Sequence, residues 1–386
     1  MPWKAWTAMS LRLEFVNFAM NEDSNISELC RRFEVSRKTG YKWINRYRAG
    51  DPLSDQSRKP HTSPQKTGND LEQAVLRVRQ LHPAWGGRKI QRRLENLGWP
   101  AVPAPSTITA ILHRNGCINP AESLKHTAWQ RFQSPTPNDL WQMDYKGHFA
   151  ADQGRCHPLT VLDDHSRYAL GLQACSDERG LTVQQRLIPI LRHYGLPRQM
   201  IMDNGSPWGA DQQHVFTPLT VWLIRQGIGI IHSRPLHPQT LGKDERFHRT
   251  FKAELGQYCI GLSLEKCQQR FDAWRDIYNF QRPHEALDMQ VPAQRYRPSH
   301  HQYTDKPRPV EYAPDDQVRK VQQNGWIDYR GKQYRVPKAF YGERIAIRPT
   351  VTDGLHDVYF CNQRIAQLNV KEQINLKTVT YVPEHL

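Results

Sequence analysis

Apolar residues in the first third of the chain recur every three or four positions, the spacing that buries one face of a helix. They predict two small helical blocks, separated by a linker rich in Gly, Pro, Ser and Lys over residues 49–68. The predicted faces of the first block are Leu11, Phe15 and Phe18, then Leu29, Cys30 and Phe33, then Tyr41, Ile44 and Tyr47. Those of the second block are Leu71, Val75, Val78 and Leu81, then Ile90, Leu94 and Leu97, then Ile108, Ile111 and Leu112.

Alternating runs and short, fully apolar runs replace the helical spacing after Asn138. They predict strands over 140–150, 158–164, 168–174, 200–202 and 228–232. Helical spacing returns between these strands and after them, over 181–194, 215–226, 242–255 and 264–278. Strands that alternate with helices predict a mixed α/β layer.

The last part of the chain predicts a small all-β domain. A stretch rich in Pro, Arg, His and Tyr, residues 294–314, is expected to be a second linker. Five short β-runs follow, at 326–329, 334–336, 344–347, 358–360 and 364–366, and they predict a small barrel. The chain is therefore expected to be a multidomain protein with two helical domains, an α/β core and a β-barrel, over residues 1–60, 69–120, 136–297 and 315–372.

Composition narrows the class of protein. The 386 residues carry a net charge of +15, with a pI near 9.6, which favours a polyanionic partner such as nucleic acid, although many basic proteins bind none. A mean hydropathy of -0.74 and the lack of a long uncharged apolar run argue against a membrane-spanning protein. Arg12 and Glu14 interrupt the apolar stretch near the N-terminus, so no signal peptide is expected. Seven scattered Cys residues without a CxxC pair fit a reduced cytoplasm better than a disulfide framework.

Three carboxylates stand where a catalytic site of an α/β layer is expected. Asp144 lies in the first predicted strand, Asp203 follows an apolar strand, and Glu245 lies in the first turn of a predicted helix. Open sheets bind ligands at the carboxyl ends of parallel strands, and hard divalent cations prefer oxygen ligands. Three such carboxylates could hold two metal ions about 4 Å apart, as phosphoryl-transfer sites do. The alternative is ordinary, since strand-end Asp residues cap turns and helix-start Glu residues stabilise the helix dipole.

Longer blocks around these carboxylates decide between the two interpretations, because they resemble the catalytic core of retroviral integrases and bacterial insertion-sequence transposases. This core is the DDE class and has a ribonuclease H-like fold. The resemblance spans about residues 138–296, and the N-terminal block also resembles the helix-turn-helix of such transposases. The sequence has no His-His-Cys-Cys zinc module of the retroviral kind. The blocks are Trp141–Asp144, Val161–Tyr168, Met202–Gly205, His237–Thr250 and Tyr278–Leu287.

The resemblance implies a catalytic, metal-binding triad of Asp144, Asp203 and Glu245, with Mg²⁺ or Mn²⁺ as cofactor. It implies a DNA transposase that cleaves at the ends of an insertion sequence and then joins them to target DNA. The implied partners are double-stranded DNA, both element ends and target, and further copies of the chain in a homo-oligomer on paired ends. Neither a membrane nor a small-molecule substrate is implied, and the expected setting is the bacterial cytoplasm, at the nucleoid when DNA is bound.

This sequence departs from the family pattern at one place. The segment between Asp203 and Glu245 is a few residues longer than in many members. A loop over 208–217 is expected to hold the surplus.

Basic residues in both helical blocks are the expected DNA readers. A helix-turn-helix places the N-terminal residues of its second helix on base edges in the major groove, and Ser36 is the predicted N-cap of that helix. An ordinary helical bundle with a basic surface is the alternative. The barrel could contact the DNA backbone or serve only as a structural or dimerising module. The expected readers are Arg37, Lys38, Lys42 and Asn45 in the first block and Arg88, Lys89 and Thr107 in the second.

Polar residues around the third carboxylate are expected to meet DNA. Lys243, Arg249 and Lys252 surround it on its helix and are expected to contact phosphate, although a solvated helix face has the same pattern. His237 and Gln239 precede that helix and could contact DNA or only shape the turn.

Other acidic residues compete with the triad. Asp163 and Asp164 are expected to hold the turn at 166–167 rather than a metal, because strand alternation sends them to opposite faces. Asp244 is expected to lie close to the apolar stripe of its helix and yet to stay accessible at the first turn.

Two other functions fit parts of the sequence. A transposase-derived, sequence-specific DNA-binding protein without catalytic activity is the main alternative, and the three intact carboxylates argue against it. A ribonuclease H-type nuclease would leave the two readers and the barrel unexplained.

The two helical blocks should recognise an element end on their own. We expect a fragment of residues 1 to about 115 to bind one terminal inverted repeat, with an affinity that falls steeply as salt rises, because binding releases counterions from DNA. Arg37→Ala or Lys38→Ala should weaken this binding. A competition gel shift measures it, and equal affinity for random DNA would show that the reader assignment is wrong.

Overall fold

The computed structural model describes residues 8–55, 67–118, 133–209, 215–232, 242–307 and 309–371. The chain divides into two compact units, Met1–Lys66 and Thr67–Leu386, and each is described by itself. The second unit contains the second helical block, the α/β core and the C-terminal β region. No helix in the described ranges is both long and apolar enough to cross a membrane.

The first unit is a three-helix domain. Ser36 accepts a hydrogen bond from the amide of Thr39 at 3.1 Å, which confirms it as the N-cap of the third helix. Asn25 caps the second helix in the same way. The helices are α1 (Ala8–Ala19), α2 (Ile26–Arg32) and α3 (Arg37–Arg48). The buried core is Phe15, Val16, Ala19, Cys30, Trp43, Ile44 and Leu53.

The predicted apolar faces of α1 and α3 are confirmed at Phe15 and Ile44, which are buried, but are wrong at their other members. The reason lies at Gly40, where a Cβ would stand 2.6 Å from Cys30 Sγ and 2.9 Å from the ring of Phe15. This close approach directs the Gly40 side of α3 inward and buries Trp43. The predicted core members Leu11, Phe18, Tyr41 and Tyr47 are exposed instead.

The second helical block is also a three-helix domain. Its predicted stripes are confirmed except at Leu81 and Leu97, which are 70% and 53% exposed. Both residues lie at the C-terminal end of their helices, beyond the turns that pack on neighbours. The helices are α4 (Asn69–Leu81), α5 (Gly87–Asn96) and α6 (Pro105–Arg114). The buried core is Ala74, Val75, Val78, Trp85, Ile90, Leu94, Ile108, Ile111 and Leu112.

A mixed sheet forms the α/β core and confirms the predicted α/β layer. Strands β3, β1, β5 and β6 are neighbours in that order, and β4 and the short β2 also pair with β3. β1 is antiparallel to β3 and parallel to β5, and β5 is parallel to β6. The strands are β1 (Leu140–Tyr145), β2 (Phe149–Ala150), β3 (Arg155–Asp163), β4 (Ala169–Cys175), β5 (Gln199–Met202) and β6 (Gly229–His232).

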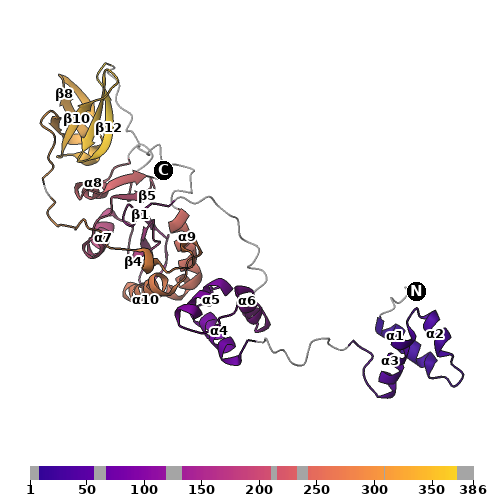
Figure 1. Cartoon of the computed structure of the whole chain (residues 1–386). Coiled ribbons are helices and arrows are strands. Elements are labelled where there is room, and N and C mark those ends of the chain that lie inside the picture. The colour runs from indigo at the N-terminus through magenta and orange to yellow at the C-terminus, as the bar shows by residue number, and fades with distance from the viewer. Residues whose placement is uncertain are drawn as a thin grey trace. The chain divides into compact units, whose positions relative to one another are not determined.

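Helices cover both faces of this sheet (Figure 1). Trp141 and Met143 of β1 belong to the apolar cluster of α7 and α8, whereas Phe247 and Phe251 of α9 pack with α10 on the other face. Because side chains alternate along a strand, the residues of β1 between and after those two apolar ones face α9. The helices are α7 (Gly180–Tyr194), α8 (Pro218–Arg225), α9 (Gly242–Glu254) and α10 (Leu264–Asp276), the last continued by a π-helical turn (Ile277–Gln281).

The C-terminal region is all β, as predicted. Its strands pair as a four-stranded antiparallel sheet in the order β12–β11–β10–β7 and as a β8–β9 hairpin. The sequence did not predict β7, because its residues are mostly polar and partly exposed. This segment is a strand because it pairs with β10, a contact that a local sequence pattern does not show. The strands are β7 (Gln317–Lys320), β8 (Trp326–Tyr329), β9 (Lys332–Arg335), β10 (Arg344–Pro349), β11 (Leu355–Phe360) and β12 (Gln363–Asn369).

Part of the stretch predicted as a second linker packs on the core instead. It begins with the short helix α11 (Pro292–Arg295). The amide of Ser299 then donates to the carbonyl of Tyr194 at 2.8 Å, and the amide of Leu196 donates to the carbonyl of His301 at 2.7 Å. These backbone hydrogen bonds fasten the segment to the end of α7, which a composition rich in Pro and Arg did not predict.

Neighbouring glycines at the start of α5 allow a matched test of packing. A Cβ at Gly87 would stand 2.5 Å from the carbonyl oxygen of Pro105 in α6, whereas a Cβ at Gly86 would meet nothing within 4 Å. We expect Gly87→Ala to destabilise the α4–α6 domain by about 1–3 kcal/mol, as overpacking does, and Gly86→Ala to change it by less than about 1 kcal/mol. Hydrogen exchange of the α5 and α6 amides measures both, and equal protection in the two variants would contradict the prediction.

Candidate active site

Two of the predicted carboxylates are neighbours across β1 and β5. The parallel register pairs Gln142 with Ile201. Asp144 lies two residues after Gln142, and Asp203 lies two residues after Ile201, just beyond the end of β5. Neighbouring strands lie about 4.8 Å apart. The fold therefore brings these two carboxyl groups to the same edge of the sheet.

Glu245, the third predicted carboxylate, lies close enough to Asp144 to affect its pKa. Burial raises the pKa of Asp144 to about 7, although the amide of Tyr145 donates to its carboxylate at 2.8 Å and lowers the pKa. The negative charges of Asp203, Glu245 and Glu178 raise it further. Glu245 itself is exposed, on the first turn of α9. Asp203 and Glu245 are thus both close enough to Asp144 to affect its pKa.

The loop after β5 holds Asp203. Burial raises the pKa of Asp203, while the amide of Gly205, which donates to its carboxylate at 3.1 Å, and the nearby His232 lower it. The Nδ1 of His232 donates to the backbone carbonyl of Asp203 at 2.9 Å. His232, at the end of β6, thereby connects the loop to the neighbouring strand.

A buried polar junction fixes the start of α9 against the sheet. Asp164 is fully buried, and it pairs with the ammonium group of Lys243. The same carboxylate accepts hydrogen bonds from the amide of Ser134 and from the side chain of Gln142, each at 2.7 Å. The carbonyl oxygen of that Gln142 side chain accepts from the amide of Asp244 at 3.1 Å. Two successive residues of α9 are thus held directly.

Asp163 has the local role that the sequence predicted. It accepts hydrogen bonds from the amide and the hydroxyl of Ser166, at 2.8 and 2.6 Å, and so holds the turn after β3. Asp164 departs from the prediction, because it holds α9 rather than only this turn.

The environment of Asp244 differs from the one that the sequence predicted. Its side chain is fully buried, not accessible at the first helical turn. Burial raises its pKa well above the ordinary value. The hydroxyl of Thr160 lies 2.9 Å from three groups, namely Asp244 Oδ2, His248 Nε2 and the carbonyl oxygen of Asp144. The residue lies inside because α9 packs its Phe247 side against the sheet and turns Asp244 onto β3.

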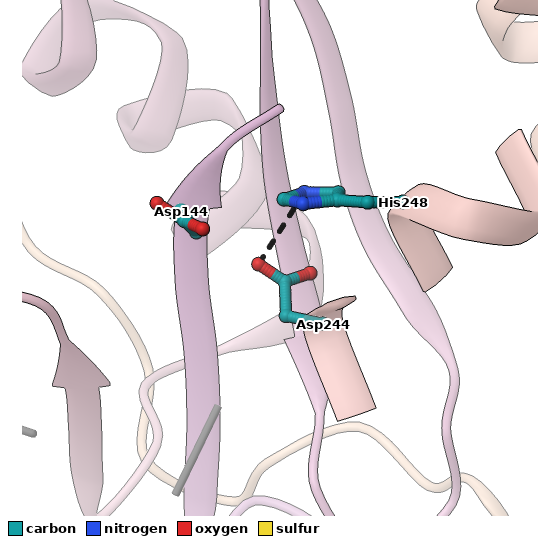
Figure 2. Close-up of side chains that lie close together, drawn as sticks. All are labelled: Asp144, Asp244 and His248. Carbon is teal, nitrogen blue, oxygen red and sulfur yellow. Dashed lines mark ion pairs between the residues drawn. The ribbon is translucent and has the colours of Figure 1, made fainter. Parts of the chain in front are cut away.

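His248 completes this buried group (Figure 2). Its Nε2 lies 3.5 Å from Asp244 Oδ2, one turn earlier on the same helix. Burial, with the positive charge of Lys146, lowers the pKa of His248 to about 3, so the imidazole is neutral. Sequence reasoning missed Thr160, Gln142 and His232 because a lone polar residue in a strand carries no signal. The spacing of Asp244 and His248, four apart on a helix, was a signal that could have been used.

Two of the predicted phosphate contacts on α9 are well placed, and one is not. Arg249 and Lys252 are exposed on the same helix as Glu245. Lys243 is instead occupied by Asp164, and burial lowers its pKa to about 8, so it does not fit a phosphate contact. His237 and Gln239 lie outside the described residues.

The predicted readers differ between the two helical domains. All four in α3 (Arg37, Lys38, Lys42 and Asn45) are exposed. In the second domain Thr107 is exposed, but Arg88 forms an ion pair with Glu285 of the core. Burial, together with the positive charge of Arg282, lowers the pKa of Lys89 to about 7.

The arrangement suits a divalent cation. Carboxylates that lie close together repel one another when ionised, and a cation relieves that repulsion. Carboxylate oxygens are the donors that Mg²⁺ prefers. The carboxylates of Asp144, Asp203 and Glu245 are donors of the type that the metal implied by the resemblance prefers. The donors that lie within 4.8 Å of one another in the described structure are those of Asp144, Asp244 and His248.

Comparison with domain families agrees with this reading along most of the chain. A helix-turn-helix domain family matches residues 11–61, and a homeodomain-like domain family matches 39–112. Two integrase core domain families match 134–238 and 226–292. The C-terminal domain of IS481 family transposases matches 316–376.

Three curated relatives match the core. An uncharacterised 31.7 kDa protein of insertion element IS407 from Burkholderia multivorans is 26% identical over 158 residues, 41% of this chain and 55% of that protein. An uncharacterised 39.2 kDa protein of insertion element IS476 from Xanthomonas euvesicatoria is 29% identical over 161 residues, 42% and 45% of the two chains. The Pro-Pol polyprotein of feline foamy virus is 29% identical over 178 residues, 44% of this chain and 14% of the polyprotein. The chain spans about half the length of the insertion-element proteins that it matches.

Solved structures with similar chains include two of viral integrases. The HTLV-2 integrase catalytic core domain in complex with magnesium is 15% identical, with a TM-score of 0.32, and the match covers 42% of this chain and 99% of that one. The simian T-cell lymphotropic virus intasome in complex with PP2A regulatory subunit B56 gamma is 18% identical, with a TM-score of 0.36, over 80% and 100% of the two chains.

The matched domains and the fold define a protein with an integrase-type, ribonuclease H-like core and helix-turn-helix DNA-binding domains. Within that class the chain is similar to bacterial insertion-sequence transposases with an integrase-like core, the resemblance that the sequence predicted.

The buried Asp164–Lys243 pair should be important for stability. Lys243→Met leaves a buried carboxylate without its counter-charge, and such losses cost about 3–5 kcal/mol. We expect a loss in the lower part of that range, because Lys243 retains 14% exposure. Lys252→Met on the exposed face of α9 is the control and should change stability by less than about 0.5 kcal/mol. Pulse proteolysis in urea measures both variants, and an equal effect in the two would refute the role of the pair.

Proposed function

We propose that this protein is a DNA transposase that binds the terminal inverted repeats of an insertion sequence, cleaves at the element ends and transfers the strand to target DNA. The observation that supports the proposal is the parallel register of β1 and β5, which puts Asp144 and Asp203 at the same end of neighbouring strands, with Glu245 in the first turn of α9 and close enough to affect the pKa of Asp144. These three carboxylates would be the catalytic residues.

The same three residues would hold Mg²⁺ or Mn²⁺. When bound, the metal supplies activation of the attacking hydroxyl or water and stabilisation of the leaving oxygen. The protein's own part is to fix the positions of the three carboxylates, through the β1–β5 register and through the anchored start of α9.

Other residues would position DNA around this site. Arg249 and Lys252 are exposed on the helix of Glu245 and are available to contact phosphates next to the scissile bond. The exposed basic residues at the start of α3 are suited to the major groove, since N-terminal residues of a recognition helix contact base edges there. The second helical domain would extend the recognised site. Of its predicted readers, Thr107 is exposed, whereas Arg88 pairs with Glu285 and burial lowers the pKa of Lys89.

Joining both element ends requires two sites of chemistry, so the active complex would contain two or more copies of the chain on paired ends. A transposase-derived DNA-binding protein that no longer cuts is the alternative. Three intact carboxylates, two of them at the same end of neighbouring strands, favour the enzyme, because a protein that only binds DNA does not need acidic groups there.

Glu245→Gln, Asp144→Asn and Asp203→Asn should each abolish end cleavage and strand transfer. Each change removes a charge and keeps the shape of the side chain, so DNA binding should survive. The measurement is cleavage and joining of labelled element ends in Mg²⁺, alongside a gel shift on the same DNA.

Glu265→Gln is the matched control. Glu265 is exposed in the first turn of α10, so its loss of charge should leave cleavage unchanged. Cleavage that survives in any of the three triad variants would remove that residue from the catalytic set. Wild-type protein that binds ends and cuts none would favour the non-catalytic alternative.

A further inference from the structure

A second set of metal-binding donors surrounds Asp144. Asp144 on β1 and Asp244 and His248 on α9 each offer a ligand atom, and these atoms all lie within 4.8 Å of one another. Figure 2 shows Asp244 and His248 pointing toward each other, with Asp144 beside them on its strand. Asp203 and Glu245 are not part of this group.

One oxygen in the group lacks a partner. Asp244 is fully buried, and its Oδ1 makes no hydrogen bond within the described structure. A buried polar atom without a partner costs about 1–3 kcal/mol, and more when the group is charged. Buried polar groups are nearly always satisfied, so an orphan oxygen among other donors points to a ligand that would satisfy it.

The rest of the group is arranged as ligands commonly are in metal sites. The hydroxyl of Thr160 lies 2.9 Å from Asp244 Oδ2. A hydrogen-bonded partner of this kind fixes the orientation of a metal ligand. Asp244 and His248 are one turn apart on α9, so the helix itself holds the two donors side by side.

We propose that Asp144, Asp244 and His248 bind a divalent transition-metal ion in a site that forms without Asp203 or Glu245. The imidazole decides the class of ion. Mg²⁺ prefers oxygen donors with near-ideal octahedral geometry, whereas imidazole suits Zn²⁺, Ni²⁺, Cu²⁺ or iron. The proposed site shares Asp144 with the proposed catalytic triad but does not depend on DNA cleavage.

Cobalt(II) is a suitable probe, because its visible absorption reports nitrogen and oxygen ligands. The protein is the full chain with Asp203→Asn and Glu245→Gln, which weakens the proposed catalytic site. We expect one Co²⁺ per chain by calorimetry, with a visible band that excess Zn²⁺ removes and an equal excess of Mg²⁺ does not.

Variants of the donors decide the assignment. Adding His248→Gln or Asp244→Asn should weaken Co²⁺ binding at least about tenfold, since even the loss of an outer hydrogen-bond partner costs about 10–100-fold in metal affinity. Thr160→Val should weaken it as well, and this variant still tests the site if Asp244→Asn does not fold. His193→Gln, which removes an exposed histidine of α7 in the same domain, should leave binding unchanged.

Two results would overturn the proposal. Loss of Co²⁺ binding in the Asp203→Asn/Glu245→Gln protein would assign the ion to the catalytic triad alone. Unchanged binding in folded His248→Gln protein would show that the imidazole is no ligand. A failure of the proposed function is distinguishable from both, because wild-type protein would then leave element ends uncut in Mg²⁺ while Co²⁺ binding followed the donors as expected.

Discussion

The buried junction between α9 and the sheet is the constraint on which the candidate site depends. Asp164 is fully buried, and it is compensated by Lys243, by the amide of Ser134 and by the side chain of Gln142. A buried ion pair adds little net stability, because desolvation offsets its attraction, but breaking it is costly. Its value here is positional, because the pair fixes the start of α9, and that start determines where Glu245 lies.

Once that helix is fixed, carboxylates become crowded. The parallel register puts Asp144 beside Asp203, and α9 adds Asp244 and Glu245. Burial and mutual repulsion both favour the neutral form of a carboxyl group, which explains why the pKa values of Asp144, Asp203 and Asp244 all rise. A cation bound there would favour the ionised carboxylates instead.

Much of the fold could be predicted from the sequence, because strands and helices of the core have regular apolar patterns. The α7 helix was expected over 181–194 and is found at Gly180–Tyr194. Helix phase was less predictable, since Gly40 has no side chain and yet determines which side of α3 is buried. The three carboxylates could be proposed as a site because Asp144 lies in the first strand, Asp203 follows a strand and Glu245 lies in the first turn of a helix. Asp164 could not be assigned its role, because its partner Lys243 is distant in sequence and only the packed fold brings the two together.

Three successive residues at the start of α9 have three different environments, and this explains why the register of the helix matters so much. Successive helix positions turn by about 100°. Lys243 therefore turns to the buried Asp164, Asp244 to Thr160 on β3, and Glu245 to the open edge where Asp144 and Asp203 stand. A slip by one position would bring an ammonium group or a buried, hydrogen-bonded acid to that edge. Lys243 is fixed by its ion pair with Asp164, and Asp244 by its hydrogen bond with Thr160. These two contacts set the rotation of α9, and the rotation determines the direction of Glu245.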